Sequence, residues 1–107
     1  MRMREEYLQI LRNQKACAES IYWAFNQNST ETAWSACERG DWMIWLWSRN
    51  VGKKGSESHL RLKCAVAHIE TYLNNVTASK LDVNSETRQK VCAEIIRNIQ
   101  PEFPGFK

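Results

Sequence analysis

The sequence has little glycine and proline, with four glycines and two prolines among 107 residues. Proteins built from many short strands need tight turns, and those turns draw on both residue types. Their scarcity therefore favours helices joined by short connections. The composition is otherwise ordinary for a globular protein, with 43% hydrophobic and 25% charged residues, so wholesale disorder is not expected. A chain of this length corresponds to one domain with one hydrophobic core.

Long apolar runs are also missing. No segment approaches the roughly 20 apolar residues that a membrane-spanning helix needs. The first residues, MRMREE, lead into an amphipathic stretch and not into an apolar signal sequence with a small-residue cleavage site. We therefore expect a cytoplasmic protein that has no membrane partner.

The apolar residues that are present recur at helical spacing. They predict an all-α protein, a compact bundle of five or six short helices in a single domain over 1–107, with an irregular tail at 100–107. Four helices are expected at residues 5–14, 16–27, 30–39 and 42–49. A longer one should begin after Ser56 or Ser58 and end near Asn74. The last should begin after Asn84 or Ser85 and end at Pro101.

Helix boundary signals cluster on both sides of the third helix. Ser29 is the expected N-cap of that helix, because its hydroxyl can accept a bond from a free backbone N–H. Gly40 is expected to end it as the C′ residue, and Asp41 to cap the next helix. That next helix has six consecutive apolar residues, 42–47, which cover all its sides. It should therefore be central, or offer one side to a partner.

Residues that could carry catalysis are few. The chain has two histidines, and it shows no nucleophile elbow, phosphate-binding loop or dinucleotide-binding pattern. We therefore predict a protein that is not an enzyme and has no cofactor. Without a secretory signal, buried free thiols are expected at all four cysteines, which are Cys17, Cys37, Cys64 and Cys92.

A metal site is an alternative use of one of these thiols. Cys64 and His68 lie four residues apart on a predicted helix, so they share a face and could chelate a metal ion together. Structural zinc sites usually bring ligands in close pairs from tight turns, and no such pair occurs in this sequence. The prediction is therefore no metal, with these two residues as the candidates if one binds.

Tryptophan is the residue in surplus. All five tryptophans lie in one 25-residue stretch, residues 23–47. Each is large and has an indole N–H that needs a partner, so a core of this size cannot hide them all. Most are expected in the core, with one or two at the surface, where Trp and Arg often anchor a partner protein. The surface that we predict for a host or cognate protein consists of Trp45, Trp47, Arg49, Lys53 and Lys54. A homodimer could cover the same apolar excess.

Nucleic-acid binding is the alternative function. The net charge is only +3, and the basic segments are separate from the aromatic ones. The basic excess lies in the first 15 residues and in residues 52–80. Phosphate contacts would then come from Arg2, Arg4, Arg12, Lys53, Lys54, Arg61 and Lys63.

Two stretches of the middle resemble a known group of proteins. Residues 16–23 read ACAESIYW, and residues 32–46 read TAWSACERGDWMIWL. They resemble the run CxxAxxW…AWxxCxRGDWMLWL of small helical proteins from bacteria and their phages, some of which are labelled immunity proteins; Ser20 and Ile44 depart from it. The resemblance covers residues 16–48 well and 63–72 more loosely. It implies a bacterial or phage origin and a binding antagonist, such as a toxin-immunity protein or an anti-defence inhibitor of the anti-CRISPR kind.

Overall fold

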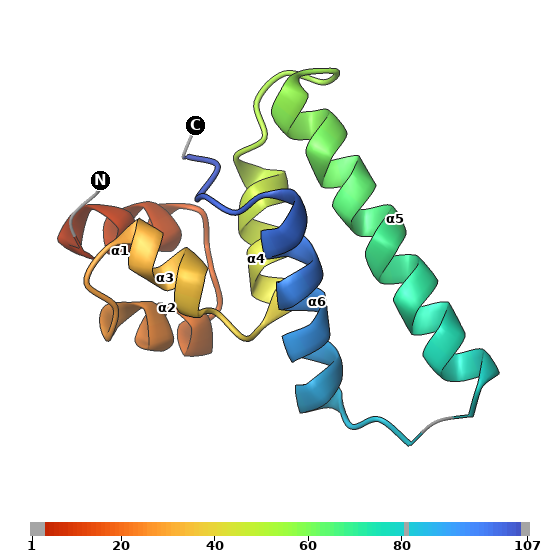
Figure 1. The fold of residues 1–107 in the computed structure, drawn as a ribbon. Helices are drawn as coiled ribbons and strands as arrows, with labels where there is room; N and C mark the ends of the chain where they lie inside the picture. The colour runs from red at the N-terminus through yellow and green to blue at the C-terminus, as the bar shows by residue number, and fades with distance from the viewer. Residues whose placement is uncertain (1–3, 81, 106–107) are drawn as a thin grey trace. The chain divides into compact units, whose positions relative to one another are not determined.

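The computed structural model describes residues 4–80 and 82–105 of the chain. This part forms six α-helices, which confirms the predicted all-helical fold class (Figure 1). They are α1 (Arg4–Asn13), α2 (Ala18–Phe25), α3 (Thr30–Ala36), α4 (Gly40–Arg49), α5 (Glu57–Ala78) and α6 (Ser85–Ile99). The chain divides into a first unit up to Ala36 and a second unit from Cys37 onward. A single domain over the whole chain stays a prediction.

In the first unit, α1 packs against α2. Leu8 and Leu11 are buried, and their spacing places them on one face of α1. The helix ends in a left-handed residue, Lys15, with a φ of 62°. There the backbone N–H of Ala16 donates to the carbonyl of Leu11 at 2.9 Å, the bond that closes a Schellman motif. The chain is therefore broken between the first two helices, and α2 begins two residues later than predicted.

The predicted cap of α3 is confirmed. The hydroxyl of Ser29 accepts a bond from the backbone N–H of Thr32 at 3.2 Å. The helix is shorter than the expected 30–39, because it ends at Ala36. Trp34 is its large buried side chain, 3% exposed.

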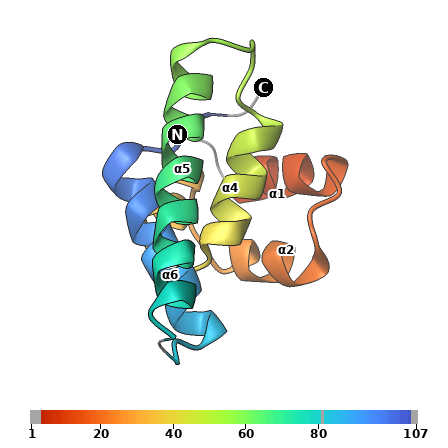
Figure 2. The same ribbon diagram turned by 90° about the vertical axis from the view of Figure 1, so that its right-hand side faces the viewer.

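The second unit consists of α4, α5 and α6, and each of these helices contacts the other two (Figure 2). The core of this unit lies among them. Its buried apolar side chains are Met43, Trp47, Leu62, Ala65, Val76, Cys92, Ala93 and Ile96. Two predicted caps are confirmed, because the Ser56 hydroxyl accepts from the N–H of His59 and the Asn84 amide oxygen accepts from the N–H of Thr87.

The predicted roles of Gly40 and Asp41 are wrong. The N-cap of α4 is Arg39, and Gly40 is the first residue of α4, not a residue that ends α3. Gly40 is buried against α6, where a Cβ would overlap the Cβ of Cys92 and lie 3.0 Å from the backbone nitrogen of Ala93. Glycine is therefore needed here for close helix packing and not for a left-handed turn.

The predicted end of the fifth helix near Asn74 is wrong, because α5 continues to Ala78. Val76 is buried, so packing extends the helix beyond its expected end. The helix ends before Lys80, which has a φ of 55°. Beyond α6, residues 100–105 form no helix.

None of the helices in the described ranges is both long enough and apolar enough to cross a membrane.

Replacing Gly40 with alanine should destabilise the protein by about 1–3 kcal/mol, because the added methyl group has no room between α4 and α6. The measurement is the free energy of urea-induced unfolding. Exposed Ser48 on the same helix supplies the control. Ser48→Gly should be less stable than Ser48→Ala by about 0.5–1 kcal/mol, the usual preference for alanine in a helix. A Gly40→Ala protein as stable as the unmodified chain would contradict the packing argument.

Candidate protein-binding surface

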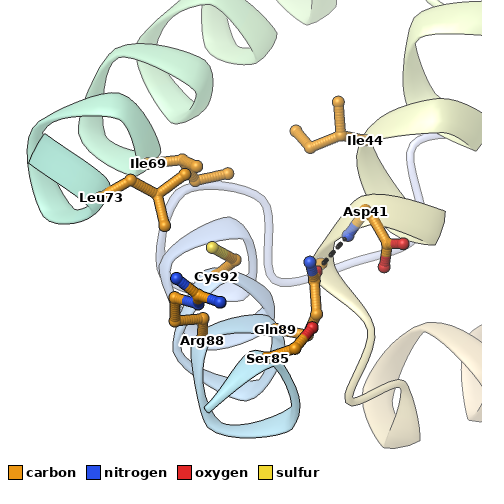
Figure 3. A pocket seen from close by; sticks show the side chains of 9 residues that line it. Asp41, Ile44, Ile69, Leu73, Ser85, Arg88, Gln89 and Cys92 are labelled. Carbon is orange, nitrogen blue, oxygen red and sulfur yellow. Dashed lines mark hydrogen bonds between the residues drawn. The ribbon is translucent and has the colours of Figure 1, made fainter. Parts of the chain in front are cut away.

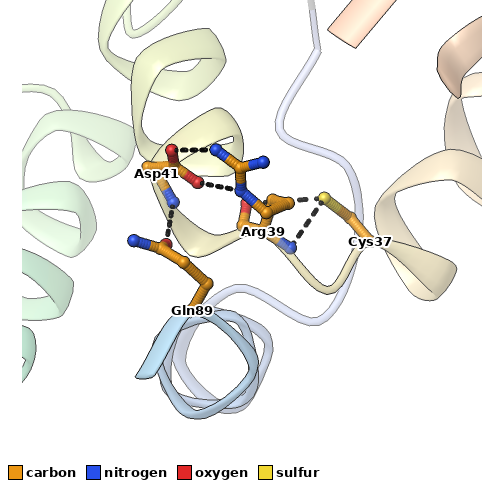
Figure 4. Close-up of polar contacts among 4 residues, drawn as sticks. All are labelled: Cys37, Arg39, Asp41 and Gln89. Atoms are coloured by element: carbon orange, nitrogen blue, oxygen red, sulfur yellow. Dashed lines mark hydrogen bonds and ion pairs between the residues drawn. The ribbon is translucent and has the colours of Figure 1, made fainter. Parts of the chain in front are cut away.

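The segment that leads into α4 is held by polar contacts (Figure 4). The guanidinium of Arg39 makes two bonds to the Asp41 carboxylate, at 2.9 and 2.7 Å. The backbone N–H of Asp41 donates to the side-chain oxygen of Gln89 on α6, at 2.9 Å. Arg97, also on α6, donates to the carbonyl of Cys37 at 2.5 Å. These contacts fix the start of α4 against α6.

Two of the α4 tryptophans each have the guanidinium of an arginine stacked over the indole ring. Arg39 lies over Trp42, 4.4 Å from the ring centroid, and Arg49 lies over Trp45 at 5.1 Å. Both distances are within the range of cation–π attraction. Trp42 and Trp45 are three residues apart, so they share a face of the helix, and both are half-buried. That face therefore combines partly exposed indoles with guanidinium groups stacked on them.

Trp47 is a correction to the predicted binding surface. Its side chain is 0% exposed, and its indole N–H donates to the hydroxyl of Ser58 on α5 at 2.9 Å. It belongs to the core and cannot contact a partner. Its neighbour Asn50 is also buried, and the side-chain nitrogen donates to the carbonyl of Leu46 at 2.8 Å. Within the described residues, no buried side-chain nitrogen or oxygen lacks a partner.

The other predicted binding residues remain accessible. Arg49, Lys53 and Lys54 are exposed, and Trp45 is half-buried. Four residues of chain span at most about 14 Å, so Lys53 lies within about that distance of Arg49. Trp42 is a binding candidate that the prediction missed, although its spacing of three residues from Trp45 is visible in the sequence. We call Trp42, Trp45, Arg49, Lys53 and Lys54 the tryptophan surface.

The basic residues of the nucleic-acid alternative are divided between the two units. Arg12 is exposed in the first unit, and Lys53, Lys54, Arg61 and Lys63 are exposed in the second. Arg61 is already engaged, with an ion pair to Glu57 at 2.6 Å and a bond to Gln100 at 3.1 Å. Arg2 and the side chain of Arg4 lie outside the described part of the chain. A continuous basic face stays a prediction.

The four cysteines are free, as predicted, but only two of them are buried. Cys37 and Cys92 lie in the interior, whereas Cys17 and Cys64 are exposed. Burial raises the pKa of the Cys37 thiol. Cys64 and His68 are both exposed on α5. In the part of the chain described, no group of three or more His, Cys, Asp or Glu residues is placed to hold a metal ion.

Comparisons with models of known protein families, with curated proteins and with solved structures gave no match for this chain.

Ser58→Ala should destabilise the protein by about 1–2 kcal/mol, because the indole N–H of Trp47 would lose its partner inside the core. Urea-induced unfolding measures this loss. The matched control is Ser48→Ala, which removes an exposed hydroxyl bonded to the carbonyl of Trp45. Its effect should stay within about 0.5 kcal/mol. Equal losses for both variants would show that the buried bond has no special weight.

The Arg39–Asp41 pair should make stability depend on pH. Burial raises the pKa of the Asp41 carboxyl, but hydrogen bonds from Arg39, its positive charge and backbone N–H groups lower it more. The net pKa lies below the ordinary value. Ionised Asp41 therefore stabilises the fold above the unfolded-state pKa, about pH 4, and this contribution is lost as the pH falls through the folded pKa.

Asp41→Asn should accordingly be less stable than the unmodified chain near pH 7 by about 0.5–1 kcal/mol, a modest value because the pair is partly exposed. The difference should shrink as the pH falls below about 4 and disappear once Asp41 is protonated in both the folded and the unfolded state. Urea unfolding over this pH range measures it. Glu70→Gln, on an exposed part of α5, is the control. A stability difference for Asp41→Asn that is constant with pH would rule out the ion pair as its origin.

Proposed function

We propose that this chain is a non-catalytic protein-binding module that inhibits or neutralises a host or cognate bacterial protein by occlusion. The supporting observation is the tryptophan surface. It places two half-buried indoles, each under a guanidinium, on one face of α4. Trp and Arg are the residue types that most often dominate the energy of protein interfaces.

The stacking also favours binding for an entropic reason. An arginine or tryptophan side chain that is free in solution loses rotamer freedom when a partner covers it. Arg39 is held both over the ring of Trp42 and in its ion pair with Asp41. The ring of Trp45 is similarly covered by Arg49. These side chains are already ordered before binding, so less affinity is lost to immobilising them.

The charge of the surface indicates what the partner should look like. Arg49, Lys53 and Lys54 are exposed cations next to the indoles in the chain. A complementary partner would present an apolar pocket for the indoles with acidic residues around it. Such an acidic rim would raise the association rate more than it would raise the affinity of the complex. The association rate would fall as the salt concentration rises.

The antagonist part of the proposal comes from the resemblance of residues 16–48 to small bacterial and phage proteins. A chain of 107 residues without a recognised catalytic pattern suits a role in which covering a surface is sufficient. Toxin immunity and anti-defence inhibition, including inhibition of a CRISPR effector, are roles of this kind. We place such a protein in the bacterial cytoplasm, where its targets act.

The test is a quantitative pulldown from a lysate of the source bacterium, with the unmodified chain and two triple variants as baits. The unmodified chain should retain one protein in stoichiometric amount. Charge reversal at Arg49, Lys53 and Lys54 should reduce retention by at least ten-fold, as expected when like charges face an acidic rim. The matched control reverses three exposed cations elsewhere, Arg12, Lys63 and Lys80, and should retain the partner.

Two outcomes would contradict the proposal. One is equal loss of the partner with both triple variants, which would indicate non-specific attraction to positive charge. The other is recovery of DNA or RNA, released by moderate salt, with no stoichiometric protein. That result would favour the nucleic-acid alternative.

A further inference from the structure

The second unit contains an open groove of about 410 Å³ between α4, α5 and α6 (Figure 3). Its volume is within the range of about 300–1,000 Å³ that is typical of ligand pockets. The groove shares no residue with the tryptophan surface. It is lined by Gly40, Asp41, Ile44, Ile69, Leu73, Ser85, Arg88, Gln89 and Cys92.

The walls of the groove are apolar. Ile44 faces it from α4, Ile69 and Leu73 face it from α5, and Cys92 lies on α6 (Figure 3). Leu73 is 37% exposed, although it lies one turn from the buried Val76. The groove therefore leaves a large aliphatic side chain in contact with water in the middle of a helix-to-helix contact. Covering this surface would be favourable, by about 25 cal/mol for each Å² of apolar area removed from water.

The polar residues at one edge of the groove favour an anion. The Arg88 guanidinium makes no hydrogen bond or ion pair with any residue that the structure describes. Among the lining residues that the structure describes, the Asp41 carboxylate is the only negative group, and Arg39 already neutralises it with two bonds. The side-chain oxygen of Gln89 accepts from the Asp41 backbone, which leaves the amide nitrogen of Gln89 as a donor. Ser85, Arg88 and Gln89 also lie in the first two turns of α6, near the positive end of its dipole.

We propose that this groove binds a small aliphatic monocarboxylate. The hydrocarbon chain would cover Ile44, Ile69 and Leu73, and the carboxylate would pair with Arg88 in the two-bond geometry that guanidinium favours. A single negative charge fits the site better than two, because Arg88 is the one cation among the described residues of the lining and the paired Asp41 carboxylate lies in the same groove. An apolar ligand without an anionic group could not form an ion pair with Arg88.

Octanoate is a suitable probe, and octan-1-ol is its uncharged counterpart. Titration of the full chain with octanoate, followed by methyl and amide NMR, should shift the signals of Ile44, Ile69 and Leu73 together. Octanol should bind at least ten-fold more weakly. Arg88→Gln should weaken octanoate binding by about ten-fold or more, the cost of losing a charged hydrogen-bonding partner. Lys63→Gln, at an exposed cation on α5, is the control and should bind octanoate as the unmodified chain does.

Three results would overturn the proposal. Octanoate could cause no saturable shifts at the groove, it could shift signals over the whole surface, or Arg88→Gln and Lys63→Gln could bind it equally well. Octanol binding as tight as that of octanoate would also reject the role of Arg88. Because the tryptophan surface is not involved, the pulldown described above can succeed or fail independently of this experiment.

Discussion

The close approach of α4 and α6 is the constraint on which the second unit depends. Gly40 lies directly against Cys92 and Ala93, so the backbones of the two helices meet where α4 begins. Everything that follows along α4 is positioned from this contact. It turns Met43 and Trp47 into the core, and by helical periodicity the tryptophan surface falls on another face. The groove lies beside this same contact, because Gly40, Asp41 and Cys92 are among the residues that line it.

Polar contacts keep that approach in register. The Arg39–Asp41 pair, the bond from Asp41 to Gln89 and the bond from Arg97 to the carbonyl of Cys37 all lie within five residues at the start of α4. The ion pair is modest by itself, because it is partly exposed and exposed ion pairs contribute at most about 1 kcal/mol. Together the three contacts fix the direction of α4 relative to the segment that leads into it, and with it the orientation of the indoles.

The second unit offers two regions for the two proposed ligands. The tryptophan surface presents indole and arginine on one face of α4, which suits the proposed partner protein with a complementary pocket. The groove is lined mainly by aliphatic side chains, and its Arg88 makes no ion pair with a described residue, which suits the proposed small anionic molecule. Each region can be altered without the other, because they share no residue.

The sequence by itself determined the fold class, a range of five or six helices and several caps, because periodicity and capping are local properties. Ser29, Ser56 and Asn84 cap the helices that their positions indicated. The sequence also indicated that the tryptophans could not all be hidden. Which tryptophan is buried was decided only by the tertiary structure, since Trp47 and Trp45 are two residues apart in one apolar run and only packing against α5 separates them. The same holds for the reason that residue 40 is glycine, because the backbone it must approach comes from α6, some fifty residues further along the chain.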